Sequence, residues 1–198
     1  KAKIPLSELK QDETEIFLNL EKSLNNLVIG QPEAVKKISS SILRSKSGVR
    51  DRNKPIASFL LLGTTGVGKT FPAKMLAKSV FGGEDKIIRV DMSEFSEKAS
   101  ISRLIGASPG YIGFEDGGYL TESIRKKPYS VVLFDEVEKA HPDVCQILLQ
   151  IMDEGELKDS NGKIANFKNA IILLTGNVGH KTFDSKKTMG FAGGEQEP

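Results

Sequence analysis

The residues with the clearest chemical meaning form a glycine-rich segment, Gly63-Thr64-Thr65-Gly66-Val67-Gly68-Lys69-Thr70, which has the spacing G-x-x-x-x-G-K-[ST]. It follows an apolar run and opens a helical pattern, the context in which such a segment binds nucleotide phosphates. Glycines allow backbone N–H groups to curl around phosphate oxygens, Lys69 would reach the β- and γ-phosphates, and the Thr70 hydroxyl would bind Mg²⁺. A glycine-rich turn that binds nothing is the alternative. The predicted phosphate-binding residues are Thr65, Gly66, Val67, Gly68, Lys69 and Thr70.

Two acids and an amide form a second candidate group. Asp135 and Glu136 directly follow four apolar residues, so a buried strand would deliver both carboxylates to the edge of a sheet where α/β proteins bind ligands. Asp135 would help to hold Mg²⁺, and Glu136 would act as the general base on the attacking water. Asn177 follows another apolar run and could contact the γ-phosphate or that water. The alternatives are acids that favour a helix N-terminus and an asparagine in a turn.

The elements that must position these groups are predicted from hydrophobic spacing. Four short apolar runs are typical of buried strands, and helical patterns separate them, which predicts an α/β fold of three αβα layers with a mainly parallel sheet. A hairpin is predicted before the last strand, because the segment 155–167 turns at Asp159-Ser160-Asn161-Gly162. The predicted strands are 56–62, 87–91, 130–135 and 170–175, and the predicted early helices are 13–26 and 33–45.

Composition excludes several classes of protein. The chain of 198 residues is 38% hydrophobic and 27% charged, in the range of one α/β domain. Its net charge of +2 shows no strong field for nucleic acid or anionic lipid, and no apolar run approaches the length of a membrane span. The single cysteine, Cys145, lies in a helical pattern and is interpreted as a core residue in a reducing compartment.

Several motifs together resemble the second ATPase domain of the two-ring AAA+ Clp unfoldases of the ClpC type. The resemblance covers nearly the whole chain and implies the large subdomain of a P-loop NTPase with ATP and Mg²⁺ as cofactors. It also implies that Val28 and Ile29 line the adenine pocket, that Asn177 senses the γ-phosphate, and that Tyr111 is the aromatic residue of the pore loop. The matching segments are 28–31, 63–70, 91–95, 102–106, 110–113, 135–142 and 175–179.

The chain departs from the family pattern at one proposed catalytic position. Lys168 stands where the family has the arginine that reaches the nucleotide of a neighbouring subunit, and lysine lacks the planar, two-pronged guanidinium. The family's fifth strand and C-terminal helical lid are also absent from the sequence, so we interpret the chain as part of a longer protein. Met189-Gly190-Phe191 resembles the tripeptide with which Clp rings dock onto a ClpP-type peptidase; a tail segment without a partner is the alternative.

The function implied by the resemblance is ATP hydrolysis coupled to threading of protein substrates through a homo-hexameric pore, into a ClpP-type peptidase. A nucleotide-binding regulatory module with little turnover is a second hypothesis, and a nucleic-acid motor is a third that the charge disfavours. We divide the chain into N-terminal helices and linker (1–50), a nucleotide-binding core (51–179) and a tail with the docking segment (180–198). The expected compartment is the cytoplasm or the stroma of a plastid-type organelle.

Overall fold

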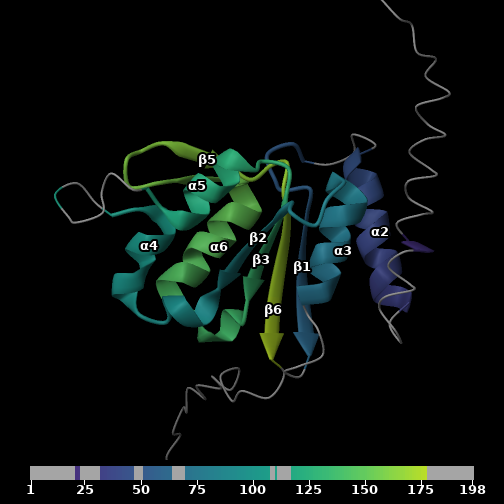
Figure 1. The fold of residues 1–198 in the computed structure, drawn as a ribbon, viewed down its shortest axis with the longest axis horizontal. Helices are drawn as coiled ribbons and strands as arrows, with labels where there is room; N and C mark the ends of the chain where they lie inside the picture. Colours follow the sequence, from purple (N-terminus) through teal and green to yellow (C-terminus); the bar gives the residue numbers. More distant parts are fainter. Residues whose placement is uncertain are drawn as a thin grey trace, which may run out of the picture.

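A four-stranded parallel sheet forms the centre of the protein (Figure 1). The computed structural model describes residues 21–22, 32–46, 51–63, 70–107, 110 and 117–177. In spatial order the strands of the sheet are β1 (Ala57–Gly63), β6 (Ile171–Asn177), β3 (Val131–Asp135) and β2 (Ile87–Asp91). Each of the four predicted apolar runs is therefore a strand, and the predicted parallel sheet is confirmed.

The register of the sheet explains why its central strands read as unbroken apolar runs. In β3, Val131 and Leu133 pack into one hydrophobic cluster, whereas Val132 and Phe134 pack into another on the opposite face. All four side chains are fully buried. A strand covered on both faces needs apolar residues at every position rather than at alternate ones.

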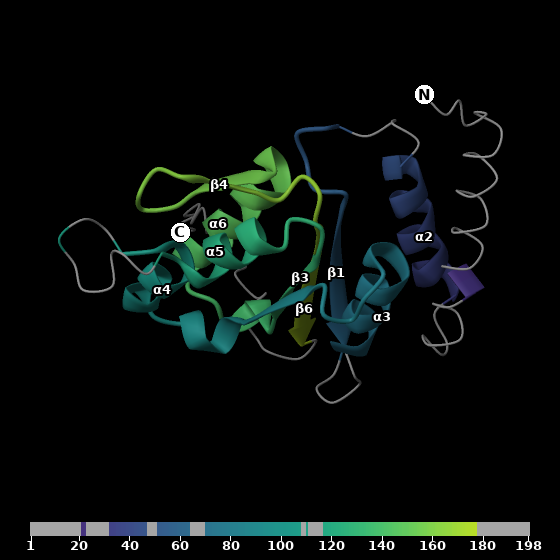
Figure 2. The same cartoon turned by 45° about the horizontal axis from the view of Figure 1, so that its top comes forward.

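Helices cover both faces of the sheet, which confirms the three-layer αβα fold (Figures 1 and 2). On one side of the sheet, one hydrophobic cluster includes apolar residues of α2 and α3. On the other side, a second cluster includes apolar residues of α4, α5 and α6. The helices are α2 (Pro32–Lys46), α3 (Thr70–Phe81), α4 (Ile101–Ile105), α5 (Tyr119–Lys126) and α6 (Pro142–Glu154), and the short 3₁₀ turns are η1 (Met92–Phe95), η2 (Lys98–Ser100) and η3 (Val137–Lys139).

The predicted hairpin is confirmed as β4 (Glu156–Lys158) paired antiparallel with β5 (Ile164–Asn166). Its turn begins at Asp159, whose side chain is 1% exposed and accepts a hydrogen bond of 2.6 Å from Arg125 of α5. Asp159 also accepts hydrogen bonds from the backbone N–H groups of Asn161 and Lys163. At the tip, the Ser160 N–H donates to the carbonyl of Ile105 at the end of α4. One buried carboxylate therefore shapes the turn and ties it to α5.

Two expectations about burial are wrong. The run 56–62 was expected to be buried, but among the described residues β1 lies at the edge of the sheet and pairs only with β6, and its side chains alternate in burial. Leu60 is 53% exposed and Leu62 is 57% exposed. Cys145 was expected in the core, but it is exposed on α6. Its neighbour Val144 is the buried residue of that turn, and the side chains of adjacent helical residues point in different directions.

Several predicted sites lie outside the described residues: Val28 and Ile29, the loop residues Thr65 to Lys69, Tyr111, and Met189, Gly190 and Phe191. Of the predicted helix 13–26, only Glu21 and Lys22 are described, and both are helical. Within the part of the chain that the structure describes, no helical lid is evident and no helix is long and apolar enough to cross a membrane.

Candidate nucleotide site

The carboxyl ends of three neighbouring strands bring the predicted groups to one edge of the sheet. Gly63, the last residue of β1, is the Cα partner of Asn177 at the end of β6. The next strand, β3, ends at Asp135. Helix α3 begins at Thr70, so the glycine-rich motif connects a strand to a helix, as its spacing predicts. This edge is where ligands bind in open α/β sheets.

Asp135 is held by two donors from neighbouring strands. Its Oδ2 accepts a hydrogen bond of 2.8 Å from the guanidinium of Arg89 on β2, and its Oδ1 accepts one from the Thr175 hydroxyl of β6. The side chain of Asp135 is 14% exposed. Thr175, which is fully buried, also accepts a hydrogen bond of 3.1 Å from the backbone N–H of Glu136. A single hydroxyl thus fixes the relative position of the two acids.

Glu136 has an unusual backbone conformation. Its φ of 58° places it in the left-handed region, the one positive φ outside glycine among the described residues. A non-glycine residue there costs on the order of 1–3 kcal/mol, and such residues cluster at functional sites. The strained backbone at Glu136 sets the direction of its side chain at a cost in the stability of the fold.

The Glu136 side chain lies between a cation and an amide. The Lys139 ammonium is 2.5 Å from Glu136 Oε2, and the Asn177 amide nitrogen is 3.5 Å from Oε1, at the long limit of a hydrogen bond. The same Asn177 nitrogen donates more closely, at 2.7 Å, to Glu138. The structure therefore brings Glu136, which directly follows β3, close to Asn177, the last residue of β6.

Two ionisable residues beside this group, Lys139 and Asp91, have shifted pKa values. The hydrogen bond to Glu136 is the largest cause of the raised pKa of Lys139; burial opposes it, and the charges of Glu136, Glu138 and Asp91 add to it. At the end of β2, the hydrogen bond from the Ser93 hydroxyl is the main cause that lowers the pKa of Asp91, although burial opposes it. The site is therefore a network of acids compensated by a few fixed cations.

The carboxylate oxygens at this edge of the sheet fit a magnesium ion that is held mainly by phosphate and water. In the described part of the chain no cluster of three or more His, Cys, Asp or Glu could hold a metal by itself. Asp135 has both oxygens engaged by Arg89 and Thr175, but each carboxylate oxygen can accept a further bond. Mg²⁺ usually keeps several waters when it binds beside nucleotide phosphates. Asp135 is suited to binding those waters rather than to building a protein cage.

Lys168, the third predicted catalytic residue, lies elsewhere. It precedes β6, whereas Asn177 ends that strand, and seven residues of strand separate the two ends by roughly 20 Å. In this chain Lys168 forms an ion pair of 2.5 Å with Glu156 of β4. The structure does not bring Lys168 to the Glu136 group of the same chain.

Sequence reasoning missed three residues that hold the acids, Arg89, Thr175 and Lys139. It also missed Glu138, which accepts a hydrogen bond from Asn177. Lys139 could have been found, because it lies three residues after Glu136, a spacing that brings side chains together in helical turns. Thr175 carried a weaker signal as a polar residue near the end of an apolar run. Nothing in the sequence indicated that Arg89 would reach a carboxylate on the neighbouring strand.

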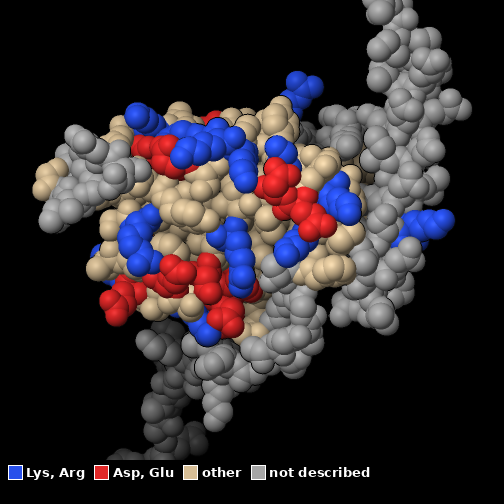
Figure 3. Space-filling view, viewed as in Figure 1, with Lys and Arg blue, Asp and Glu red and all other residues tan. Residues whose placement is uncertain are grey.

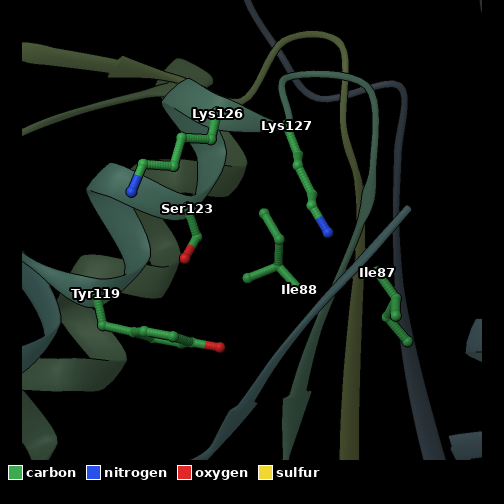
Figure 4. A pocket seen from close by; sticks show the side chains of 6 residues that line it. All are labelled: Ile87, Ile88, Tyr119, Ser123, Lys126 and Lys127. Atoms are coloured by element: carbon green, nitrogen blue, oxygen red, sulfur yellow. The ribbon is translucent and has the colours of Figure 1, made fainter. Parts of the chain in front are cut away.

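A separate hollow of about 150 Å³ lies between β2 and α5, away from the strand ends (Figure 4). Its lining residues are Ile87, Ile88, Tyr119, Ser123, Lys126 and Lys127. The Tyr119 hydroxyl donates to the carbonyl of Arg89 at 3.0 Å, and the Lys127 ammonium donates to the carbonyl of Asp85 at 2.8 Å. Both bonds cap carbonyl groups along the edge of the sheet, which protects it against pairing with another strand.

Comparison with known proteins agrees with the αβα fold. A family model described as AAA domain (Cdc48 subfamily) matches residues 54–197. The chain belongs to this family. Its sequence is of the ClpC type, which confirms the resemblance drawn from the motifs.

The relatives carry the description "ATP-dependent Clp protease ATP-binding subunit ClpC". The protein of Staphylococcus saprophyticus is 53% identical over 190 residues, which cover 96% of this chain and 23% of the relative. That of Staphylococcus epidermidis is 52% identical over 193 residues, covering 98% and 24%. That of Staphylococcus aureus strain USA300 is 53% identical over 190 residues, covering 96% and 23%. The chain thus spans about a quarter of their length. These bacterial relatives give the plastid alternative no support.

Proposed function

We propose that this chain is the ATP-binding and hydrolysing core of a Clp-type protein unfoldase. The observation that carries the proposal is the meeting of Asp135, Glu136 and Asn177 with Gly63, the first residue of the phosphate-binding motif, at one edge of the sheet. An acid pair and an amide beside a phosphate loop have the geometry that nucleoside triphosphate hydrolysis needs.

In the proposed reaction Glu136 accepts the proton of the attacking water. Asn177, whose amide nitrogen is 3.5 Å from Glu136, orients that water or the γ-phosphate. Thr175 holds the Glu136 backbone, and Lys139 compensates the charge of its carboxylate. Bound MgATP supplies the phosphoryl group and the metal charge that offsets its developing negative charge.

The remaining contacts with nucleotide are assigned from the motif and the resemblance. The predicted phosphate contacts are Thr65, Gly66, Val67, Gly68 and Lys69. Thr70, with Asp135, would hold Mg²⁺ and its waters, and Val28 and Ile29 would line the adenine pocket. Support comes from the position of Thr70, the last residue of the motif and the first of α3, where backbone N–H groups and the helix dipole favour phosphate. The proposed core is 51–179, between helices in 1–50 and a tail in 180–198.

Protein unfolding is proposed from the likeness to ClpC. The printed description of the relatives joins an ATP-binding subunit to a Clp protease, and this supports docking to a ClpP-type peptidase through Met189, Gly190 and Phe191. Tyr111 would grip protein substrates in the pore of a homo-hexamer. On the face drawn in Figure 3, Lys and Arg lie beside Asp and Glu rather than in one basic groove, which favours a protein substrate over nucleic acid.

A regulatory module with little turnover is the second candidate, and one contact favours it. Lys168, in the position of the family's arginine, is paired with Glu156 of its own chain. A lysine engaged in this way offers less charge to a neighbouring subunit than an arginine would. The two candidates make different predictions about ATP turnover.

The test is steady-state ATP hydrolysis by the full-length protein and by this chain, each with the substitution Glu136→Gln. An unfoldase core hydrolyses ATP in the full-length form, and Glu136→Gln abolishes turnover while leaving nucleotide binding intact. Glu154→Gln is the matched control, because it removes an exposed carboxylate of α6 that is bonded only locally to Gln150. Nucleotide binding without turnover in the unsubstituted full-length protein would favour the regulatory module.

A further inference from the structure

A guanidinium lies on the carboxylate that the proposed function assigns to the metal. Arg89 donates a hydrogen bond of 2.8 Å to Oδ2 of Asp135, and the contact is also an ion pair. The two residues meet because β2 and β3 are neighbouring parallel strands, with Arg89 two positions before the end of β2 and Asp135 at the end of β3. A positive side chain of the protein is therefore bound to the acid that would serve Mg²⁺.

The two partners of this ion pair differ in burial and in restraint. The side chain of Asp135 is 14% exposed, whereas that of Arg89 is 53% exposed. The Thr175 hydroxyl also binds Asp135, at Oδ1, and it comes from β6 on the other side of β3. Asp135 would therefore keep its place without Arg89, but its charge would no longer be compensated by the guanidinium.

Arg89 also lines a hollow of about 360 Å³ that contains other acids. The lining residues are Arg89, Val90, Asp91, Glu94, Phe95, Arg103 and Tyr119. The hydrogen bond from the Ser93 hydroxyl is the main cause that lowers the pKa of Asp91, burial opposes it, and the charge of Arg89 adds to it. The guanidinium thus has room beside Asp135, and a second carboxylate already interacts with its charge.

We propose that Arg89 competes with Mg²⁺ for the charge of Asp135, so that the metal binds firmly only together with nucleotide phosphates. Arg89 is then a positioning residue, because it acts on the metal through Asp135. This inference rests on the proposed function, in which Asp135 helps to hold Mg²⁺ and its waters. Mg²⁺ binds proteins through one or two carboxylates together with phosphates, and a cation on one of those carboxylates makes the phosphates more important.

The inference predicts the sign of the effect of removing Arg89. Without the guanidinium, Asp135 offers its full charge to the metal, and the repulsion between two cations disappears. Across several ångströms of water and salt, this repulsion changes the affinity for a divalent ion by about two- to eightfold. If Arg89 only supported the shape of the site, its removal would weaken metal binding instead.

The test measures how much Mg²⁺ strengthens the binding of ADP to the full-length protein. The affinity for ADP is determined with Mg²⁺ and with EDTA, and the ratio of the two affinities reports metal binding without any turnover. Binding of ADP in EDTA also shows that the site of each variant is folded. Arg89→Gln is expected to raise the ratio by about two- to eightfold. An unchanged or lower ratio overturns the inference.

Two single variants are matched controls for the charge. Arg103→Gln removes an equal charge from the same hollow, but Arg103 is paired with Glu94 at 3.1 Å rather than with Asp135, so the ratio should not change. Arg89→Lys keeps the positive charge and should stay within about twofold of the unsubstituted protein. A rise in either control as large as that in Arg89→Gln overturns the inference.

A double-mutant cycle tests the route through Asp135. In the Asp135→Asn background, Arg89→Gln should change the ratio less than it does in the unsubstituted protein, because the carboxylate that holds the guanidinium is gone. An equal change in both backgrounds overturns the inference. The Asp135→Asn protein also supplies the baseline, so that only metal bound through this carboxylate is counted.

The two proposals fail in different ways. If Asp135→Asn lowers the ratio but Arg89→Gln does not raise it, only the competition by Arg89 is wrong. If Asp135→Asn leaves the ratio unchanged, Asp135 does not hold the metal, the proposed assignment of Mg²⁺ is wrong, and the inference falls with it.

Discussion

The buried carboxylate of Asp159 is predicted to stabilise the fold by tying the hairpin to α5. The change Asp159→Ala removes a side chain that is 1% exposed and accepts a 2.6 Å hydrogen bond from Arg125. Loss of one partner of a buried ion pair costs on the order of 3–5 kcal/mol, mostly because the other charge is left without compensation. Arg125 is 23% exposed and keeps a 2.6 Å contact with Glu122, so we expect the lower end, about 3 kcal/mol.

The other lost hydrogen bonds add little to this figure. Asp159 also accepts from the backbone N–H groups of Asn161 and Lys163, but both residues are exposed and water can replace the carboxylate there. Urea unfolding measures the loss as a lower midpoint with an unchanged m-value. Asp153→Ala is the control: its 3.3 Å pair with Lys54 is largely exposed, at 72% for the acid, and should contribute less than about 1 kcal/mol.

The stabilisation by the ion pair of Asp159 and Arg125 has a predictable pH dependence. Burial is the largest single influence on the pKa of Asp159 and raises it, but the hydrogen bond and charge of Arg125, together with the backbone N–H groups of Lys163 and Asn161, outweigh burial and lower the pKa below the usual 3.8. Because folding lowers this pKa, the stabilisation is complete above about pH 4 and is lost as the pH falls through the folded-state value. The difference in unfolding free energy between the unsubstituted chain and Asp159→Asn should therefore shrink below pH 4. A difference that is independent of pH, or a loss in Asp159→Ala no larger than in Asp153→Ala, would refute this reasoning.

Three further predictions address the hairpin and the site. Gly155→Ala should destabilise the chain by at least about 2 kcal/mol in thermal unfolding, because φ is +62° and the new Cβ would lie 2.3 Å from the carbonyl oxygen of Asn53. Gly162→Ala, at a φ of +74° with no atom within 4 Å, should cost only about 1–2 kcal/mol, and equal losses would contradict the steric argument. Thr175→Val should lower kcat for ATP hydrolysis by at least about tenfold, since it removes the acceptor of the Glu136 N–H; an unchanged kcat would show that this bond does not position Glu136. Lys168→Arg should raise ATP turnover of the full-length protein by about tenfold or more, and an unchanged rate would remove Lys168 from the reaction.

Much of the fold could be predicted because its signals are local. The apolar runs at 87–91 and 130–135 became strands almost to the residue, and the turn at Asp159-Ser160-Asn161-Gly162 became the turn of a hairpin. The order of the strands could not be predicted from local signals, which is why the run 56–62 was correctly predicted as a strand but wrongly expected to be buried. A central strand and an edge strand have similar composition, yet only the central strand is covered on both faces.

In the candidate site, too, local signals were predictable and long-range contacts were not. Spacing alone located the phosphate-binding motif, and alternation of strands with helices was enough to expect Asp135, Glu136 and Asn177 at one edge of the sheet. Their partners were not predictable: Arg89 lies 46 residues from Asp135, and Thr175 lies 39 residues from Glu136. Such contacts depend on which strands are neighbours and on their register.

The sequence by itself therefore determined the family of the chain, the type of its elements and the chemical groups available for nucleotide hydrolysis. Only the tertiary structure decided which cation compensates which acid from another strand or segment, pairing Arg89 with Asp135 and Lys168 with Glu156. The physical reason is the separation along the chain over which each effect acts. Backbone propensity and hydrophobic period act over a few residues, whereas an ion pair forms wherever the packed sheet brings two side chains within a few ångströms, whatever their separation along the chain.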